Sequence, residues 1–354
     1  MAEKNNNVGR LDEKQHIIVI GASSGGFGAL KTIAKKLPAD FAPPMMVVWH
    51  MSPDVRSVLP DALNKISPVS AAHARNMEDL VPNRIYVAPP DRHMILDDDK
   101  IRVTRGPKEN RFRPAIDPLF RSAAYAYGNR VIGVILSGGL DDGTAGLWTI
   151  KHYGGVTIVQ DPSDAEVPSM PENALREVKI DHSLPVAEIG ALLIRLAEQP
   201  VSKNSVVVND EQTRKEIEIA GEHDTVQKNF LGFGKLTPYT CPECQGVLSR
   251  LQNENIIRYR CHTGHAFSAD SLLTAIGEKI EDSMYNAIRG IHESIILLNH
   301  LGDHYAEANN PKLAALYFKK AQEAARHAET IRQAALSHEQ FNKDSLRHLV
   351  EDSG

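Results

Sequence analysis

The segment 17-IIVIGASSGGFGAL-30 decides how the first half of the chain folds. Its four β-branched residues predict a buried strand, the small residues that follow predict a tight turn, and residues 27–37 have the pattern of a helix. Short apolar runs recur at 45–49, 84–88, 131–136 and 156–160, and helix-like segments follow at 55–65, 117–127, 143–153 and 171–176. This alternation predicts an α/β fold with a mostly parallel sheet covered by helices on both faces.

Four segments follow from the pattern along the chain. Residues 16–198 hold the strands and helices, with a β-hairpin expected at 92–106 around Asp97–Lys100 and a last helix at Val186–Glu198. Residues 199–237 are polar and are predicted to be a linker, and residues 238–268 contain every cysteine. Apolar residues three to four apart over 273–298 and an alanine-rich run over 311–336 predict a helical hairpin within 269–340.

The composition is typical of a globular protein, with 42% hydrophobic residues among 354 and a net charge of −5. That charge gives no electrostatic reason to expect a nucleic acid or an anionic membrane as partner. No apolar run is long enough for membrane insertion, and residues 1–15 lack an apolar signal region, so we expect a cytoplasmic location. No feature of the sequence sets an oligomeric state.

The turn Gly21-Ala-Ser-Ser-Gly-Gly26 could bind the phosphates of a nucleotide, or it could hold a catalytic serine. It lacks the G-x-G-x-x-G spacing of a dinucleotide site, and His50, not an acid, follows the second strand. A serine exposed at a strand-to-helix turn suits a nucleophile, which requires a base and an orienting carboxylate. His50 and the pair Asp141 and Asp142 follow other strands, where the parallel strands would end at one edge of the sheet. Each of these residues could equally have a structural role in a turn, a cap or a hydrogen bond.

Six motifs in order resemble the protein-glutamate methylesterase family of bacterial chemotaxis, over about residues 16–198: IGASSGG, VVWHMSP, YVAPPDRHMIL, GP-x-x-NRFRPAIDPLF, VILSGGLDDGTAG and MPENAL. The resemblance implies a doubly wound (Rossmann-like) sheet and a serine esterase that needs no cofactor for catalysis. It implies Ser23 as nucleophile, His50 as base and Asp142 as orienting acid, because Asp142 directly precedes the glycine of the family's Asp-Gly-x-x-Gly pattern. Backbone N–H groups near Ser24 and Gly25 would bind the oxyanion. The implied substrate is a glutamate γ-methyl ester on a chemotaxis-type receptor or related signalling protein, with glutamine deamidation as the same chemistry.

Three further residues are candidates for lining this site. Arg111 and Arg113 could grip acidic groups of a substrate, or lie in a solvated loop. His93 could line the cleft, or make a structural hydrogen bond. Two departures from the family pattern stand out. A family methionine ahead of the aspartate has no clear match in Gly138-Gly139-Leu140-Asp141, and only about sixteen residues precede the first predicted strand, so we expect no receiver domain and no control by aspartyl phosphorylation in cis.

The cysteine segment predicts a structural zinc site in a small zinc ribbon. Cys241 and Cys244 form a C-x-x-C knuckle, and sixteen residues separate it from 261-CHTGH-265. We expect Cys261 and His265 to complete the ligand set, since adjacent Cys261 and His262 would not converge as readily. The alternative is three reduced thiols without metal. The module resembles extensions on some receiver-lacking members of the methylesterase family.

Two other functions compete with the esterase. One is a signalling scaffold that has kept an esterase-like fold and acts through its C-terminal extension. The other is a small-molecule carboxylesterase. The combination of Ser23, His50 and Asp142 favours the protein-glutamate methylesterase, because a scaffold has no need of all three.

Overall fold

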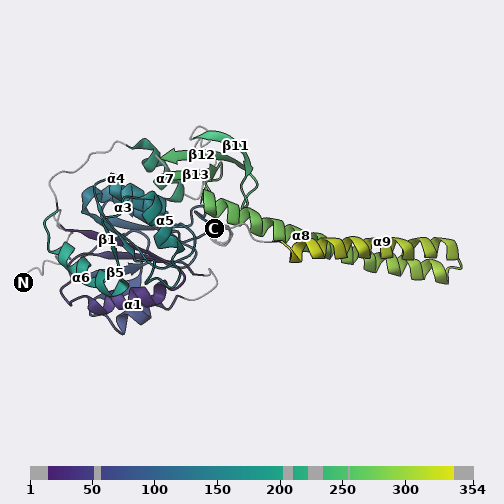
Figure 1. Ribbon diagram of the computed structural model, residues 1–354, viewed down its shortest axis with the longest axis horizontal. Helices are drawn as coiled ribbons and strands as arrows, with labels where there is room; N and C mark the ends of the chain where they lie inside the picture. The colour runs from purple at the N-terminus through teal and green to yellow at the C-terminus, as the bar shows by residue number, and fades with distance from the viewer. Residues whose placement is uncertain (1–14, 52–56, 202–209, 222–233, 254–255, 339–354) are drawn as a thin grey trace, which may run out of the picture. The chain divides into compact units, whose positions relative to one another are not determined.

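A seven-stranded parallel sheet forms the centre of the protein (Figure 1), in the strand order β10-β9-β8-β1-β2-β5-β3. The computed structural model describes residues 15–51, 57–201, 210–221, 234–253 and 256–338. The strands are β1 (Ile17–Ala22), β2 (Met45–Trp49), β3 (Ser70–His73), β5 (Arg84–Val87), β8 (Val131–Ile135), β9 (Val156–Gln160) and β10 (His182–Leu184). The predicted α/β sheet is confirmed; the two strands that the sequence pattern missed, β3 and β10, are short and lie at its edges.

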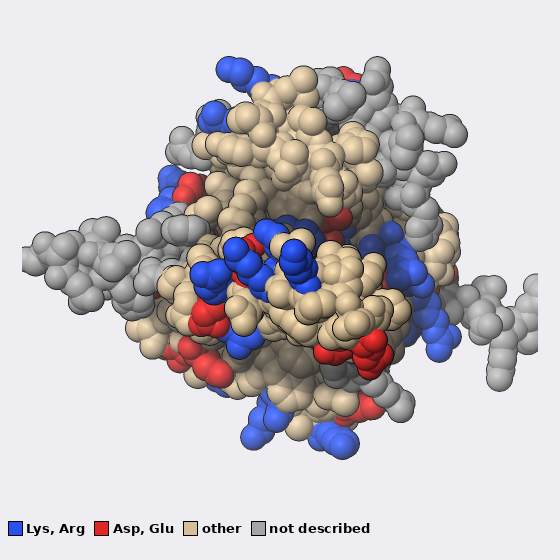
Figure 2. Space-filling model, turned by 90° about the vertical axis from the view of Figure 1, so that its right-hand side faces the viewer, with Lys and Arg blue, Asp and Glu red and all other residues tan. Residues whose placement is uncertain are grey.

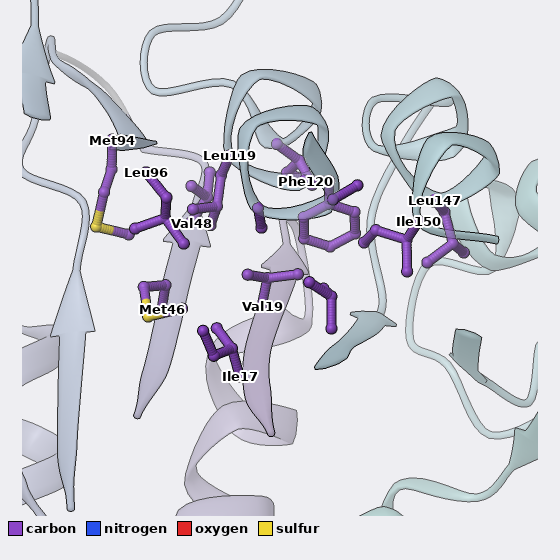
Figure 3. Packing of buried hydrophobic residues seen from close by; sticks show 14 of the residues in the cluster. Ile17, Val19, Met46, Val48, Met94, Leu96, Leu119, Phe120, Leu147 and Ile150 are labelled. Atoms are coloured by element: carbon purple, nitrogen blue, oxygen red, sulfur yellow. The ribbon is translucent and has the colours of Figure 1, made fainter. Parts of the chain in front are cut away.

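Helices cover both faces of this sheet, as expected for a doubly wound fold (Figure 1). On one face lie α1 (Gly26–Lys36), α2 (Leu59–Asn64) and α6 (Val186–Ala197); on the other lie α3 (Ile116–Tyr127), α4 (Thr144–His152) and α5 (Ser169–Glu177), and a 3₁₀ turn at Gly128–Arg130 follows α3. Successive side chains of β1 alternate between the two cores, so Ile17 and Val19 enter one core and Ile18 and Ile20 enter the other. Figure 3 shows Val19 near Phe120 of α3 in the first core.

A three-stranded antiparallel sheet is formed by one strand that precedes β5 in the chain and two strands that follow it. It consists of β4 (Glu78–Asp79), β6 (His93–Asp97) and β7 (Lys100–Thr104), and β6 and β7 form the hairpin predicted at 92–106. Met94 and Leu96 of β6 join the core beside α3 (Figure 3). The hairpin therefore brings the segment after it, residues 105–115, to the rim of the central sheet.

The cysteine segment forms a four-stranded antiparallel sheet, which we call the ribbon: β11 (Lys235–Thr240), β12 (Val247–Asn253), β13 (Ile256–Cys261) and β14 (Ala266–Ser268). The region expected to be a linker, 199–237, contains a helix, α7 (Glu211–Gly221), which packs against α3. The buried face of α7 carries Glu216, which forms ion pairs with Arg121, Arg258 and Arg260. Because this buried residue is charged, the sequence of α7 has the polar pattern that is typical of a linker. Residues 202–209 and 222–233 of that expected linker lie outside the described residues.

The described residues divide into two compact units, and the second begins at Leu272. It holds most of α8 (Ala269–Glu307) and all of α9 (Pro311–Leu336). The two helices of the hairpin pattern are present, and α8 continues as far as Glu307, beyond the apolar repeat that ends at residue 298. Buried alanines recur every seven residues along α9, at Ala314, Ala321, Ala328 and Ala335. Asn310 caps α9 by accepting the Leu313 N–H at 3.3 Å.

No helix within the described ranges combines the length and the apolar character that a membrane span requires. Acidic and basic side chains are interspersed on the face shown in Figure 2. This distribution agrees with the nearly balanced composition of 40 basic and 45 acidic residues.

Candidate active site

Ser23 occupies the tight turn between β1 and α1. Its N–H donates to the Ser137 carbonyl at 3.0 Å, and its own carbonyl accepts from the Trp49 indole at 3.1 Å. Gly25 caps α1 with a φ of 75°, and a Cβ there would lie 2.5 Å from Ser137 Oγ, so no larger residue fits. Gly138 leaves room for the Ser23 side chain, because a Cβ at position 138 would lie only 2.8 Å from Ser23 Cβ. The glycines of the turn thus hold one serine side chain at the end of β1.

His50 and Asp142 form a buried pair at the neighbouring strand ends. His50 Nε2 lies 2.8 Å from Asp142 Oδ2, and the same oxygen accepts the Ile116 N–H at 2.7 Å. The second oxygen, Oδ1, accepts from the side chain of Asn110 at 2.9 Å. A carboxylate oxygen accepts hydrogen bonds, so the contact with Oδ2 fixes the imidazole tautomer with its proton on Nε2. The Nδ1 atom of His50 is buried and has no hydrogen-bond partner among the described residues.

A pocket of about 410 Å³ opens beside this pair, lined by Ser23, Ser24, His50, Met51, Asp91, Lys108, Arg111, Phe112 and Arg113. Phe112 stacks on the His50 ring, with ring centroids 3.8 Å apart and planes 8° from parallel. Within the described part of the chain Ser23 makes no hydrogen bond to His50, although both side chains line the same pocket. Such contacts are commonly long in an enzyme without substrate.

The candidate lining residues divide into two groups. Ser24, Arg111 and Arg113 line the pocket, and Arg113 is held there by Asp91, with Nη2 and Oδ1 2.7 Å apart. Gly25, expected to offer its backbone N–H to an oxyanion, is the N-cap of α1 and is not among the residues that line the pocket with their atoms.

His93 is likewise not among the residues that line the pocket. It is fully buried, its Nδ1 accepts the Ala115 N–H at 3.3 Å, and its Nε2 lies 2.9 Å from the Pro107 carbonyl. Burial lowers the pKa of this imidazole and keeps it neutral. His93 therefore makes the structural hydrogen bonds that were the alternative to a place in the cleft.

Three residues near the site were not singled out from the sequence: Asn110, Phe112 and Asp117. All lie in the stretch 106-GPKENRFRPAID-117. The many charged and polar residues of this stretch were the feature of the sequence that could have indicated a place near the site. Asp117 Oδ1 accepts the Gly146 N–H at 2.6 Å, and its Oδ2 lies 2.9 Å from Asn110 Nδ2. Burial and the neighbouring Asp142 raise the pKa of Asp117 to about 8, so Asp117 is protonated at neutral pH.

Cys241, Cys244, Cys261 and His265 come together in the ribbon, with all their ligand atoms within 4.8 Å of one another. The Cys244 and Cys261 sulfurs are 3.6 Å apart, and Cys261 Sγ lies 3.5 Å from His265 Nδ1. Four ligands around zinc, with Zn–S bonds of about 2.3 Å, would place two sulfurs about 3.8 Å apart. This Cys₃His cluster therefore has the residues and the spacing of a tetrahedral zinc site, and His262 is not part of it.

Comparisons with known proteins agree with this architecture. A family model described as CheB methylesterase matches residues 18–193. A putative protein-glutamate methylesterase/protein-glutamine glutaminase of Leptospira interrogans is 38% identical over 180 residues, which are 51% of this chain and 93% of that relative. The chain belongs to the CheB methylesterase family. It is accordingly an enzyme, a protein-glutamate methylesterase.

Other members of the CheB methylesterase family differ in length. A protein-glutamate methylesterase/protein-glutamine glutaminase of Photorhabdus laumondii is 34% identical over 188 residues, 52% of this chain and 53% of the relative. The solved Thermotoga maritima CheB methylesterase catalytic domain is 35% identical, with a TM-score of 0.50, and the match covers 51% of this chain and 98% of that domain. The match to the CheB methylesterase family model ends before α7, so α7, the ribbon and the helical hairpin lie outside it.

Proposed function

We propose that Ser23, His50 and Asp142 hydrolyse glutamate γ-methyl esters on a chemotaxis-type receptor or a related signalling protein, through an acyl-enzyme. The observation that carries this proposal is the 2.8 Å contact between His50 Nε2 and Asp142 Oδ2 at a pocket that Ser23 also lines. A hydroxyl, an imidazole and a carboxylate in one pocket have the components of a serine hydrolase.

In the first half of the reaction, Ser23 Oγ attacks the ester carbonyl carbon while His50 takes the hydroxyl proton. Because Nε2 of His50 faces Asp142, the base is Nδ1, the ring nitrogen left without a hydrogen bond among the described residues. The protonated imidazole then gives this proton to the methoxide oxygen, and methanol leaves. Asp142 stabilises the imidazolium that forms between these two transfers.

In the second half, water attacks the acyl-Ser23 carbonyl and His50 again carries the proton, which restores the serine and releases a glutamate carboxylate. The oxyanion of both tetrahedral intermediates would accept from the N–H groups of Ser24 and Gly25, just before α1 begins at Gly26. The positive end of that helix adds to the stabilisation. A glutamine side chain could follow the same path with ammonia as leaving group.

The rim of the pocket favours an acidic protein surface as substrate. Lys108, Arg111 and Arg113 line it against a single acidic lining residue, Asp91, which pairs with Arg113, and Lys108 also pairs with Glu243. Cationic groups at the mouth attract a segment that carries further carboxylates, such as a receptor region with several modifiable glutamates.

The Cys₃His cluster would hold a structural zinc ion through Cys241, Cys244, Cys261 and His265. Four protein ligands leave no open position for catalysis, so the metal would stabilise the ribbon and take no part in ester hydrolysis. Metal analysis of the purified protein tests this: we expect about one zinc per chain, and a loss of bound zinc in Cys244→Ser.

Methanol release from a receptor fragment that carries glutamate γ-methyl esters tests the catalytic proposal. We expect release by the wild type and near-complete loss in Ser23→Ala, while Ser294→Ala on an exposed turn of α8 serves as the matched serine control. Equal release by the wild type and Ser23→Ala would remove Ser23 as the nucleophile. No release by any of the proteins would favour the scaffold instead.

A further inference from the structure

The side chain of Asn110 joins the catalytic aspartate to the ribbon. Its Nδ2 donates to Asp142 Oδ1 and to Asp117 Oδ2, each at 2.9 Å. Its Oδ1 accepts the Ser268 N–H at 2.8 Å and the Ser271 hydroxyl at 3.1 Å. Asn110 is only 5% exposed, so this amide makes all of these bonds away from solvent. One buried side chain thus connects the end of β14 with Asp142.

The ribbon decides which way this amide points. The backbone N–H of Ser268 can only donate, so the oxygen of the Asn110 amide must face it. The NH₂ group of Asn110 must then face Asp142, where a donor to the carboxylate is needed. If the amide turned over, it would place an oxygen against the charge of Asp142 and an NH₂ group against another donor. The position of Ser268 therefore enforces the donor that Asp142 receives.

Backbone pairing holds the same joint together. Asn110 N–H donates to the Ala266 carbonyl at 2.8 Å, and Ala266 N–H donates to the Lys108 carbonyl at 3.2 Å. The Ser268 hydroxyl donates to Asp141 Oδ1 at 2.7 Å, next to the catalytic aspartate. The segment that supplies Lys108 to the pocket is therefore an added strand-like partner of β14.

The metal ligands lie immediately before this contact in the chain. β13 ends at Cys261, His265 directly precedes β14, and Cys261 N–H donates to the His265 carbonyl at 3.0 Å. Arg260, one residue before Cys261, reaches Glu109 with Nη2 and Oε1 3.0 Å apart. An ordered ligand set at Cys261 and His265 would fix the chain from which β14 starts.

We propose that the ribbon acts on the esterase site through Asn110, a positioning residue that β14 and the start of α8 hold against Asp142. The inference rests on the proposed roles of His50 and Asp142. Loss of the Asn110 donor leaves the negative charge of Asp142 more concentrated on the oxygen that faces His50. The imidazolium of His50 is then stabilised before the reaction, so a smaller fraction of His50 is unprotonated and able to act as the base at a given pH. Asp117 on α3 is the other titratable group that shares the Asn110 amide, and it stays protonated at neutral pH.

The variant Asn110→Gly tests the positioning role. Glycine accepts the φ of 49° at this residue without strain, so the change removes the amide alone. We expect kcat to fall about tenfold to a hundredfold, with KM within about twofold, because one hydrogen bond to a charged group is lost. The acid limb of the kcat/KM profile should move to higher pH. Asn83→Gly is the matched control, because Asn83 has a φ of 53° and donates to the Ala39 carbonyl.

Ser271→Ala is the milder second variant. It removes the donor that the start of α8 supplies to Asn110 Oδ1 and leaves the Ser268 donor, the metal ligands and the triad unchanged. We expect kcat to fall about twofold to tenfold, with the acid limb displaced in the same direction. Bound zinc and the unfolding midpoint, measured on each variant, separate this effect from loss of the fold.

The proton on His50 Nε2 gives a readout that does not depend on turnover. In proteins with ¹⁵N-labelled histidine, we expect its NMR signal to shift in Asn110→Gly and to shift in the same direction after zinc is removed from the wild type. An unchanged signal after metal removal would overturn the link to the ribbon, and wild-type kinetics in Asn110→Gly would overturn the positioning role. Full activity of Ser23→Ala in the same assay would instead reject the proposed function.

Discussion

The variant Glu216→Gln probes the buried ion cluster that joins α7 and the ribbon to α3. Glu216 Oε2 lies 2.5 Å from Arg258 Nη1, 3.0 Å from Arg260 Nη2 and 3.2 Å from Arg121 Nη1. Glu109 is the second carboxylate, 2.8 Å from Arg121 Nη2 and 3.0 Å from Arg260 Nη2. Burial alone would raise the pKa of Glu216, but the arginines hold it far below its usual range. The cluster therefore contains three guanidinium groups and two carboxylates.

The expected loss follows from this charge balance. Three positive and two negative charges leave +1, and glutamine at position 216 leaves +2 in a site where Glu216 is 1% exposed. Removing one partner of a buried pair typically costs about 3–5 kcal/mol, because the remaining charges stay desolvated. For a domain of this size, that loss corresponds to a fall of about 6–20 °C in the unfolding midpoint.

Thermal unfolding followed by circular dichroism measures this loss, with Glu218→Gln on the exposed side of α7 as the matched control. In the double variant Glu216→Gln/Arg258→Met, two guanidinium groups and one carboxylate again leave +1. We therefore expect the double variant to lose clearly less stability than the sum of the two single changes. A midpoint within about 2 °C of the wild type for Glu216→Gln, or strictly additive single changes, would refute the reasoning.

Three further predictions concern the turn at Gly25, the pair His50 and Asp142, and acid stability. Gly25→Ala places a Cβ 2.5 Å from Ser137 Oγ at a φ of 75°, so we expect a loss of at least about 1–3 kcal/mol in a urea unfolding curve and reduced methanol release. Asp142→Asn presents an amide to His50 and favours the wrong tautomer, so we expect kcat for methanol release to fall about a thousandfold or more, as in serine-protease triads. Burial alone would raise the pKa of Glu109, but Arg121 and Arg260 lower it from 4.5 to about 2. A lowered carboxyl pKa gives stability that is present above the unfolded pKa and is lost as the pH falls, so wild-type urea midpoints should drop between about pH 5 and pH 2, and drop less in Glu109→Gln.

The central fold was predictable because the composition of each short segment indicates whether that segment forms a strand or a helix. The runs at 17–20, 45–49 and 131–136 are apolar and, apart from Trp49, buried, so their composition alone predicted strands. The edge strand β10 is short and half-exposed, and it carries no comparable signal. Helix α7 was expected to be a linker, because a buried glutamate with distant arginine partners cannot be told from a solvated one in a sequence.

The site was predictable only in part, for a related reason. Ser23, His50 and Asp142 each follow a strand, and parallel strands place such residues at one edge of the sheet. Asn110 and Phe112 lie in a loop whose course depends on pairing with Ala266, more than 150 residues further along the chain. The sequence left His93 with two roles, and both of its ring nitrogens lie within hydrogen-bond distance of backbone groups, which is the structural alternative.

The pairing of residues 108–110 with β14 sets a limit on shortening this protein. A chain that ends after α6 would still contain the region that matches the CheB methylesterase family model. It would, however, expose the Arg121 side chain, which is 2% exposed in the full chain. It would also leave the Asn110 side-chain oxygen without the hydrogen bond from the Ser268 N–H. We therefore expect a chain that ends at residue 198 to be less stable than a chain that extends through Ser271, because only the longer chain keeps the partners of Arg121 and Asn110.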